Sequence, residues 1–461
     1  MKAQIVEIRT TLQKCFGDEI EEIAQEIGFV QRQSKLTGLK FVETWVMGFV
    51  EKPTASLNYL AQIAADLDVN ITKQGLQDRL SRGSVEFMAA VLERCFAHLR
   101  NTIPIDISLL KQFAGVEIVD SSGFGLPDRL ENEFRGSGGD GPKSSIKLQT
   151  VWDFLHGNML RIVTQNGKQT DQSFHEHATN ILSGWLCLSD LGYFALQTIE
   201  TIIKNQAYFI SRWSTSCGLV DPATKAKFDL LAYLQNTDEN LLEMNFWFGI
   251  QNKISCRFLA IRLPPEALEI KRRQLHENAR RKGRKISAAS LVWIEWNLFI
   301  TNVPQERLSL EQVALIYRLR WQIELLFKLW KSECQIDQIA GHTKNRVLCE
   351  IYAKLIGVII FQYVSSPLRW TDRELSPVKA FQTFRRLAVS LAQALQDSNR
   401  LELLLSKMID IWQRHCFKDQ RQSRPSTCQQ IVLSETVDSK IFDKFGYLFV
   451  NHLPLAPNFL T

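Results

Sequence analysis

The segment from Ala314 to Lys331, ALIYRLRWQIELLFKLWK, restricts the fold of this chain more than any other stretch. Four polar side chains follow one another in it at offsets of three, four and seven residues: Tyr317, Arg320, Glu324 and Lys331. At about 100° per residue, an α-helix brings all four within roughly 60° of one another. Ser309 and Gln312 predict a capping box where the helix begins.

The same segment carries an apolar stripe that we expect to face a core: Leu319, Ile323, Leu326, Phe327 and Trp330. The polar row beside it permits two interpretations. A carboxylate can hold a divalent cation, while a phenol, a guanidinium and an ammonium suit a phosphate backbone. Alternatively, the row is a solvated helix face with ion pairs between residues one turn apart.

The spacing Tyr-x2-Arg-x3-Glu-x6-Lys is present here without a gap or a substitution. It resembles the signature of insertion-sequence transposases of the insertion-sequence-four type, which are relatives of the transposon-five transposase. In that family the Glu is the last member of an Asp-Asp-Glu triad that binds metal. The resemblance therefore implies that Glu324 is a metal ligand, that Tyr317, Arg320 and Lys331 contact DNA phosphates, and that two Asp residues lie upstream.

Two upstream segments offer those Asp residues. In GVEIVDSSGF the apolar run Val116–Val119 ends at Asp120, and in WLCLSDLGYF the strand candidate Leu186–Leu188 is followed by Asp190. An Asp after a strand is also a common way to begin a turn, so neither residue is specific alone. As a set, Asp120, Asp190 and Glu324 are the predicted catalytic and metal-binding residues. Arg212, near the end of the predicted strand AYFISRWST, matches a basic residue that the family uses near the phosphate.

A basic run covers Lys271–Lys285, with eight Lys or Arg and one Glu. Such a run is either a solvated helix or loop, or a phosphate-binding surface. We predict DNA contacts by six of its residues: Lys271, Arg272, Arg273, Arg280, Arg281 and Lys282.

The segment SLVWIEWNLFITNV, which follows the basic run, predicts a long strand with Trp293 and Trp296 exposed or half exposed. The family has a Trp before the corresponding strand that stacks on a flipped base, so the resemblance implies this role for Trp296, or the equivalent position for Asn297. Core packing is the alternative for both Trp residues.

Alternating strands and helices in the middle of the chain predict an α/β fold. The resemblance implies a ribonuclease-H-like catalytic core interrupted by a β-rich insertion, because the interval from Asp190 to Glu324 is too long for a plain core. We expect a helical DNA-binding region at 1–105, a catalytic domain at 106–372 with the insertion at about 217–290, and a helical C-terminal region at 373–461 that pairs protomers. Within the insertion, DLLAYLQ, LLEMNFWFGI and ISCRFLAIRL are the predicted strands.

Length and composition agree with a DNA-binding protein but do not require one. A chain of 461 residues can form two or three domains, and a net charge of +6 permits a nucleic-acid partner. Nine Cys residues without a C-x-x-C pair argue against a zinc ribbon or a disulfide framework. The charged N-terminus is unlike a secretory signal, and we find no long apolar run that predicts a membrane span. We therefore expect a cytoplasmic protein. The resemblance implies a bacterial host, in which the protein joins the nucleoid when it binds DNA.

The combined hypothesis is a DNA transposase that moves an insertion sequence by cut-and-paste transposition. The resemblance implies phosphoryl transfer with two Mg²⁺ ions, for which Mn²⁺ can substitute, through 3′-strand nicking, hairpin formation and strand transfer. The expected partners are double-stranded DNA with terminal inverted repeats, target DNA and a second protomer. Two alternatives stay open, namely an inactive or domesticated DNA-binding protein of the same fold and a metal-dependent, structure-selective nuclease.

Overall fold

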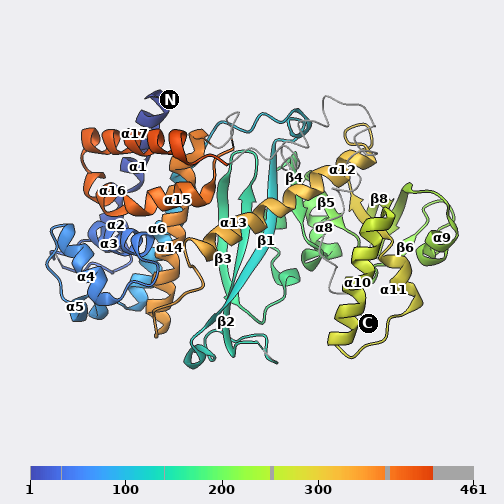
Figure 1. Ribbon diagram of the computed structural model, residues 1–461, viewed down its shortest axis with the longest axis horizontal. Helices are drawn as coiled ribbons and strands as arrows, with labels where there is room; N and C mark the ends of the chain where they lie inside the picture. The colour runs from blue at the N-terminus through green and yellow to red at the C-terminus, as the bar shows by residue number, and fades with distance from the viewer. Residues whose placement is uncertain (1, 33, 140, 250–253, 369–373, 419–461) are drawn as a thin grey trace. The chain divides into compact units, whose positions relative to one another are not determined.

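The computed structural model describes residues 2–32, 34–139, 141–249, 254–368 and 374–418. Within them nine strands form a mixed sheet in the hydrogen-bonded order β3-β2-β1-β4-β5-β9-β8-β7-β6, and most of the other regular structure is helical (Figure 1). The strands are β1 (Gly115–Leu126), β2 (Ser144–Asp153), β3 (Asn158–Asn166), β4 (Trp185–Ser189), β5 (Tyr208–Arg212), β6 (Leu219–Val220), β7 (Leu241–Phe248), β8 (Ile254–Arg262) and β9 (Trp296–Thr301). The predicted α/β class is confirmed, whereas ribonuclease-H-like topology stays a prediction.

Strand direction divides the sheet into a parallel centre and antiparallel flanks. β1 pairs with β4, and β4 with β5, in parallel. β2 and β3 pair antiparallel on one flank, and β5, β9, β8, β7 and β6 pair antiparallel in succession on the other. Parallel strands that are covered on both faces are apolar along their length, as the buried run Leu186–Leu188 of β4 shows. The predicted strands at β4 and β5 are confirmed, and the helix α8 (Leu196–Lys204) lies between them in the chain.

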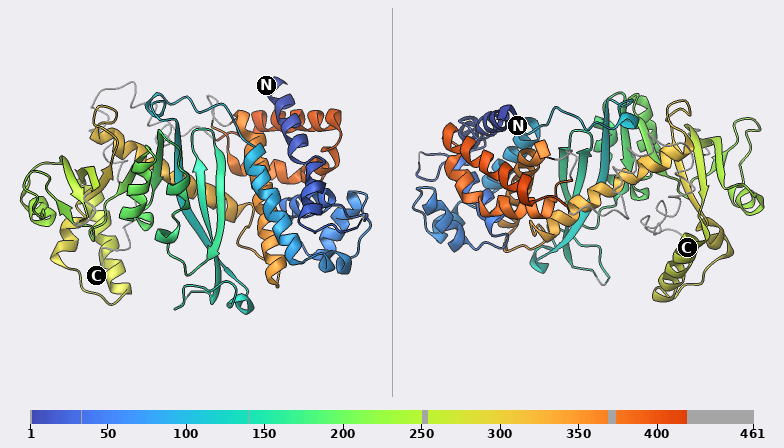
Figure 2. Two further views of the ribbon diagram at one scale, coloured as in Figure 1. Left: turned by 180° about the vertical axis from the view of Figure 1, so that it is seen from behind. Right: turned by 45° about the horizontal axis from the view of Figure 1, so that its top comes forward.

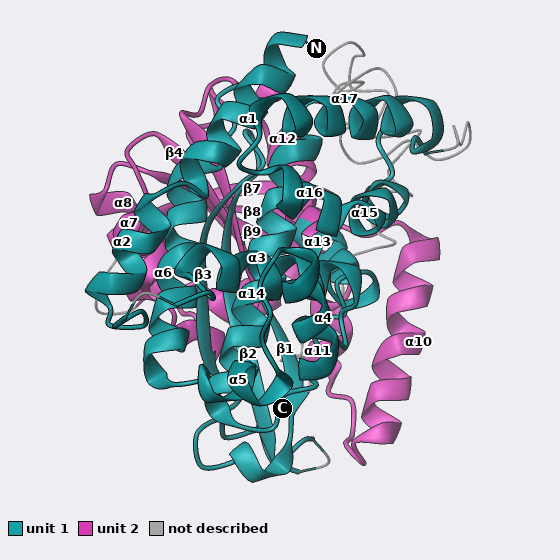
Figure 3. Cartoon of the chain, turned by 90° about the vertical axis from the view of Figure 1, so that its left-hand side faces the viewer, with its two compact units in different colours: residues 1–105, 121–169, 323–421 teal, residues 106–120, 170–322, 422–461 magenta. Residues whose placement is uncertain are grey.

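The chain folds into two compact units (Figure 3). Unit 1 consists of residues 1–105, 121–169 and 323–421, and unit 2 of residues 106–120, 170–322 and 422–461. The division passes through β1. The strand belongs to unit 2 up to Asp120 and to unit 1 from Ser121 onward. The division also passes through α13 (Trp321–Ser332), whose residues from Ile323 onward belong to unit 1.

Unit 1 contains the helices from both ends of the described chain. Figures 1 and 2 show the N-terminal helices, in blue, side by side with the C-terminal helices, in orange and red. They are α1 (Lys2–Cys15), α2 (Glu19–Glu26), α3 (Gly38–Glu51), α4 (Leu57–Asp66), α5 (Lys73–Asp78), α6 (Arg82–His98), α14 (Lys344–Ser365), α15 (Pro377–Arg386), α16 (Ala388–Ala394) and α17 (Ser398–His415). Within the described residues, the regular structure up to residue 105 and from residue 377 to residue 415 is helical. The predicted C-terminal stretch beyond residue 418 lies outside the described residues.

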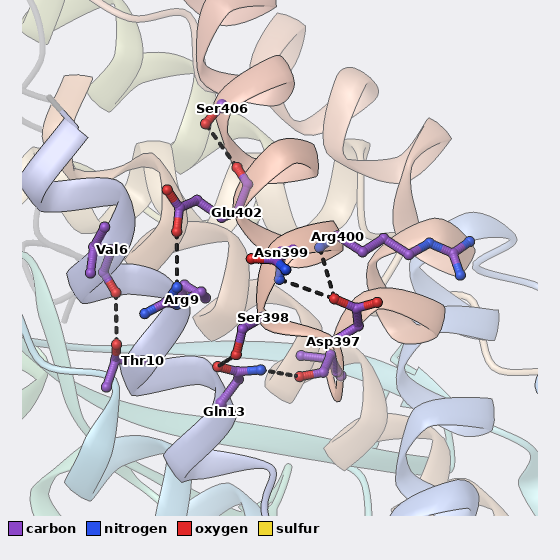
Figure 4. Close-up of polar contacts among 11 residues, drawn as sticks. Val6, Arg9, Thr10, Gln13, Asp397, Ser398, Asn399, Arg400, Glu402 and Ser406 are labelled. Atoms are coloured by element: carbon purple, nitrogen blue, oxygen red, sulfur yellow. Dashed lines mark hydrogen bonds and ion pairs between the residues drawn. The ribbon is translucent and has the colours of Figure 1, made fainter.

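Polar contacts join α1 to the start of α17 and to the residues before it (Figure 4). Arg9 and Glu402 form an ion pair at 2.9 Å. Gln13 donates a hydrogen bond to the Leu395 carbonyl at 3.0 Å and accepts one from the Ser398 hydroxyl at 3.1 Å. The first helix of the chain is therefore held by the last described helix through side chains as well as apolar packing.

Helix α14 forms part of the core of unit 1. In the described residues it is the one helix long and apolar enough to cross a membrane, but 89% of that apolar window is buried inside the protein. Its Glu350 accepts hydrogen bonds from the Ala340 and Gly341 backbone N–H groups and pairs with Lys354 at 3.0 Å. A polar pair of this kind, satisfied within the protein, fits a core helix.

Unit 2 contains helices where the sequence predicts strands. DLLAYLQ forms α9 (Leu230–Asn236), because the Asp229 carboxylate caps it at the Ala232 N–H, 3.1 Å away, and Leu230 and Leu234 are buried one turn apart. The predicted long strand at SLVWIEWNLFITNV is also wrong in its first half. Ser287 caps α11 (Ala288–Trp293), and β9 begins only at Trp296.

Candidate active site

The signature segment forms three consecutive helical pieces rather than the predicted single helix. They are α12 (Leu310–Tyr317), a 3₁₀ turn η5 (Arg318–Arg320) and α13. The predicted capping box is confirmed, since Ser309 and Gln312 satisfy each other's backbone N–H groups. A 3₁₀ turn has about three residues per turn, so the 100° spacing fails across η5. Four of the five residues expected in the apolar stripe are buried, and the fifth, Leu326, is half-buried.

Asp120 forms an ion pair with Arg320. The Arg320 Nη1 donates to Asp120 Oδ2 at 2.9 Å, with side-chain exposures of 4% and 17%. Asp120 lies inside β1 and not at the strand end as predicted. After it, burial alternates along the strand to Leu126, which is the pattern of an extended segment covered on one face, so the small residues that predicted a turn continue the strand.

Asp190 follows β4 directly, as predicted, and is half-buried. Its carbonyl accepts a hydrogen bond from the Tyr193 N–H at 3.0 Å, which begins the short turn η4 (Leu191–Tyr193). The parallel register pairs Val119 of β1 with Ser189 of β4, and each of these residues precedes one of the two Asp residues. Neighbouring strands lie about 4.8 Å apart, so Asp120 and Asp190 stand at the same level of adjacent strands.

Tyr317 links the signature segment to the end of β4. Its buried hydroxyl donates to the Ser189 carbonyl at 3.3 Å, one residue before Asp190. Burial raises the pKa of this phenol. The Arg320 guanidinium opposes that rise in pKa, and the Asp190 carboxylate adds to it.

Arg212 and Asp120 also act on the Tyr317 phenol, with smaller effects on its pKa. Unit 2 therefore brings together five of the predicted site residues: Asp120, Asp190, Arg212, Tyr317 and Arg320.

Arg212 is the last residue of β5 and is buried at 6% exposure. Its partner in the antiparallel register is Phe299 of β9, whose ring makes an edge contact with Tyr317 at 5.2 Å between centroids. Neither Phe299 nor the Ser189 carbonyl was predicted from the sequence. Predicting either of them requires knowledge of the strand register, which no local sequence pattern provides.

The basic run begins inside α10 (Pro265–Arg281), covers the rest of that helix and continues into the loop that follows it. Five of its six predicted DNA contacts are exposed: Arg272, Arg273, Arg280, Arg281 and Lys282. Arg272 is also paired with Glu295 at 3.1 Å. The expected surface position of Lys271 is wrong, because its side chain is buried at 4% exposure and donates to Asn297 Oδ1 at 3.1 Å.

The expected exposure of Trp296 is also wrong. Its side chain is 1% exposed, and the Arg262 guanidinium lies 4.6 Å from its ring. Trp293, at the end of α11, is half-buried and packs against Trp213 at 5.6 Å. The register of β9 places Trp296 opposite Arg262, and that neighbour covers the ring.

The remaining signature residues belong to unit 1. Glu324 lies in the first turn of α13 and is half-buried, and the Lys331 Nζ donates to the Gly123 carbonyl at 3.2 Å. In the described part of the chain, no group of three or more His, Cys, Asp or Glu side chains is assembled that could hold a metal. Asp120 and Asp190, which stand at one level of adjacent strands, carry hard oxygen donors of the kind that Mg²⁺ and Mn²⁺ prefer.

Comparison with known proteins shows the family of this chain. Residues 111–360 match the family described as "Transposase DDE domain", which covers more than half of the chain. The chain belongs to this family of DDE transposases and is a metal-dependent enzyme that cleaves DNA.

Three relatives illustrate the similarity. The transposase for insertion sequence element IS231B of Bacillus thuringiensis subsp. berliner is 27% identical over 433 residues, which cover 88% of this chain and 90% of the relative. The transposase for IS1151 of Clostridium perfringens is 28% identical over 79% of this chain and 82% of its own length. A putative transposase, InsL, for IS186A of Escherichia coli is 35% identical over 34% of this chain and 42% of the relative.

Proposed function

We propose that this chain catalyses cut-and-paste transposition of an insertion sequence and belongs to the insertion-sequence-four type, related to the transposon-five transposase. The observation that carries this proposal is the pair of carboxylates at one level of β1 and β4, with Arg320 on Asp120 and Tyr317 on the carbonyl before Asp190. A DDE reaction centre requires Asp residues in this relationship, and the signature segment supplies the third carboxylate, Glu324, four residues after Arg320.

Asp120, Asp190 and Glu324 would hold two divalent cations, Mg²⁺ with Mn²⁺ as a substitute. When bound, such ions neutralise the scissile phosphate and activate the attacking water or 3′-OH. Arg320 fixes the Asp120 carboxylate in one orientation through a charge-assisted hydrogen bond. Tyr317 fixes the end of β4 through the Ser189 carbonyl and so orients Asp190, while Arg212 and Lys331 provide cations for the phosphates next to the reacting one.

DNA contacts outside the reaction centre follow from the same proposal. The helical region 1–105 would recognise the terminal inverted repeats, and the exposed basic residues of α10 would follow the phosphate backbone of the same duplex. In a ribonuclease-H-like core at 106–372, Trp293 is a better candidate than Trp296 for stacking on a flipped base, because Trp293 is half-buried and Trp296 is fully buried. Residues 373–461 would pair two protomers on DNA.

The test is a reaction of the purified protein with the DNA that flanks its own gene, in Mg²⁺, followed on a denaturing gel. Hairpinned ends that disappear in Glu324→Gln, but persist in the control Glu306→Gln, support the proposal. Glu306 is an exposed residue of the loop before α12, so its substitution leaves the site intact. Nicks without hairpins would instead favour a structure-selective nuclease, and binding without cleavage in both Mg²⁺ and Mn²⁺ an inactive DNA-binding protein.

A further inference from the structure

Lys271 is a buried lysine in the apolar stripe of a basic helix. The buried side chains of α10 recur every four residues: Ala267, Lys271, Leu275 and Ala279. The neighbouring residues Arg272 and Arg273 face solvent. A cation inside an apolar stripe is unfavourable unless the surrounding groups stabilise it, so the position of Lys271 calls for a physical explanation.

The polar surroundings of Lys271 come from two strands. Its Nζ donates to Asn297 Oδ1 of β9 at 3.1 Å, and Asn297 is itself 5% exposed. Burial, together with the Arg212 guanidinium at the end of β5, lowers the pKa of Lys271 to about 7. In the described residues, Arg212 is the charged group that acts on this ammonium.

The register of β5 and β9 places these groups on one face of the sheet. Arg212 pairs with Phe299, and Asn297 is two residues from Phe299, so the three side chains point to the same side. Phe299 in turn packs on Tyr317. A continuous buried row therefore runs from Lys271 of α10 to the phenol beside the Asp190 strand.

We propose that Lys271 is a positioning residue that acts on DNA phosphate through Arg212. The Lys271 ammonium on α10 donates to Asn297 and adds a positive charge near the Arg212 guanidinium. Through these two residues, the basic helix acts on the reaction centre. This inference rests on the proposed role of Arg212 in phosphate binding. The Lys271 side chain is 4% exposed, and its ammonium donates to Asn297 Oδ1.

In this arrangement, the affinity of Arg212 for phosphate depends on whether Lys271 is protonated. Two neighbouring buried cations repel each other, and a phosphate bound at Arg212 offsets that repulsion. DNA binding therefore favours protonated Lys271, so affinity should decrease as the pH rises through about 7. If bound phosphate raises the pKa of Lys271 by one unit, the affinity changes by about tenfold across the transition.

The experiment compares Lys271→Met with Asn297→Asp and with the control Gln274→Met, which lies on the exposed face of α10. The probe is the duplex that flanks the gene, and Kd, KM and kcat for cleavage are measured from pH 6 to pH 9. Wild-type protein and Gln274→Met should lose affinity as the pH rises. Lys271→Met should raise KM more than it lowers kcat and abolish this pH dependence. Asn297→Asp, which gives the ammonium a carboxylate, should move the transition to higher pH.

An unchanged pH dependence in both Lys271→Met and Asn297→Asp would overturn the inference. Asn297→Asp keeps the lysine, so it remains informative if Lys271→Met does not fold. Wild-type protein that shows the transition in Kd but never cleaves would contradict the proposed function and leave the role of Lys271 intact. Cleavage with hairpins, but without any effect of Lys271→Met on the pH dependence, would contradict the role of Lys271 alone.

Discussion

Arg320 Nη1 lies 2.9 Å from Asp120 Oδ2, which joins the first proposed metal ligand to the signature segment across 200 residues of sequence. Both side chains are largely withdrawn from solvent. A guanidinium that balances a carboxylate in such a place stabilises the fold and also fixes the carboxylate for catalysis. The same arginine therefore has a structural and a catalytic consequence, and the two can be separated by mutation.

Replacing Arg320 by Ala should destabilise the protein and abolish cleavage. Removal of one partner from a buried ion pair takes away much of the compensation of the other charge, which costs up to about 3–5 kcal/mol. Urea unfolding of Arg320→Ala, Asp120→Ala and the double variant measures the coupling. The double variant should lose clearly less stability than the sum of the two single variants, and simple additivity would contradict the importance of the pair.

Tyr317→Phe should slow cleavage while leaving DNA affinity nearly unchanged. The substitution removes the hydroxyl that donates to the Ser189 carbonyl and leaves the ring on Phe299. We expect the free energy of unfolding to fall by about 1 kcal/mol, which is typical of one hydrogen bond. Single-turnover cleavage at saturating protein is the measurement.

The matched control for this phenol is Tyr208→Phe. Tyr208 is on β5 of the same unit, and its ring packs against Phe113 and beneath Arg307. Equal rates for Tyr317→Phe and the wild-type protein would show that the end of β4 needs no fixation by this hydroxyl.

The exposed basic residues of α10 should contribute to affinity in a salt-dependent way. Substituting Arg273, Arg280 and Arg281 by Gln should reduce the slope of log K against log salt by about 0.9 for each phosphate that is no longer neutralised. Filter binding between low and moderate salt measures this slope. Arg414→Gln, at an exposed ion pair of α17, is the control. An unchanged slope in the triple variant would remove α10 from the DNA surface.

His177 should make the protein less stable in mild acid. Its ring is buried between Phe174 and Tyr193, and burial lowers its pKa to about 4. An unfolded histidine binds its proton near pH 6.5, so the unfolded state binds more protons between about pH 4 and 6.5. The free energy of unfolding should therefore fall as the pH decreases through this window, by up to about 1.4 kcal/mol per unit.

The variant His177→Phe should retain more of its stability at pH 5 than the wild-type protein does. Urea midpoints at pH 7 and pH 5 provide the comparison, with His276→Gln, an exposed position on α10, as the control. If His177→Phe loses as much stability as the wild-type protein, other groups dominate the acid response.

Local patterns in the sequence predicted local structure well. The capping box at Ser309 and the buried strand before Asp190 each depend on residues a few positions apart, and both are confirmed. The family resemblance supplied the three carboxylates as a set. The contact between Asp120 and Arg320 could be identified only from the fold, because the two residues are 200 positions apart in the sequence.

The sequence-based predictions were wrong where tertiary neighbours decide the outcome. In the basic run, Lys271 lies four residues from Ala267 and from Leu275, on the apolar face of the helix, whereas Arg272 and Arg273 do not. This four-residue spacing could have predicted that Lys271 is buried. Trp296 is covered by Arg262 from the next strand, which no local pattern indicates. DLLAYLQ was predicted to be a strand, but the Asp229 cap and the one-turn spacing of Leu230 and Leu234 favour a helix.

The most direct test of the transposase proposal is the single-turnover cleavage rate of Asp120→Asn, Asp190→Asn and Glu324→Gln at equal DNA occupancy. Each substitution keeps the shape of the side chain and removes its charge. We predict that all three variants bind the end DNA with nearly wild-type affinity and form neither nicks nor hairpins in Mg²⁺ or Mn²⁺. A wild-type cleavage rate in any one of them would contradict the assignment of that carboxylate, and wild-type rates in all three would contradict the DDE reaction centre itself.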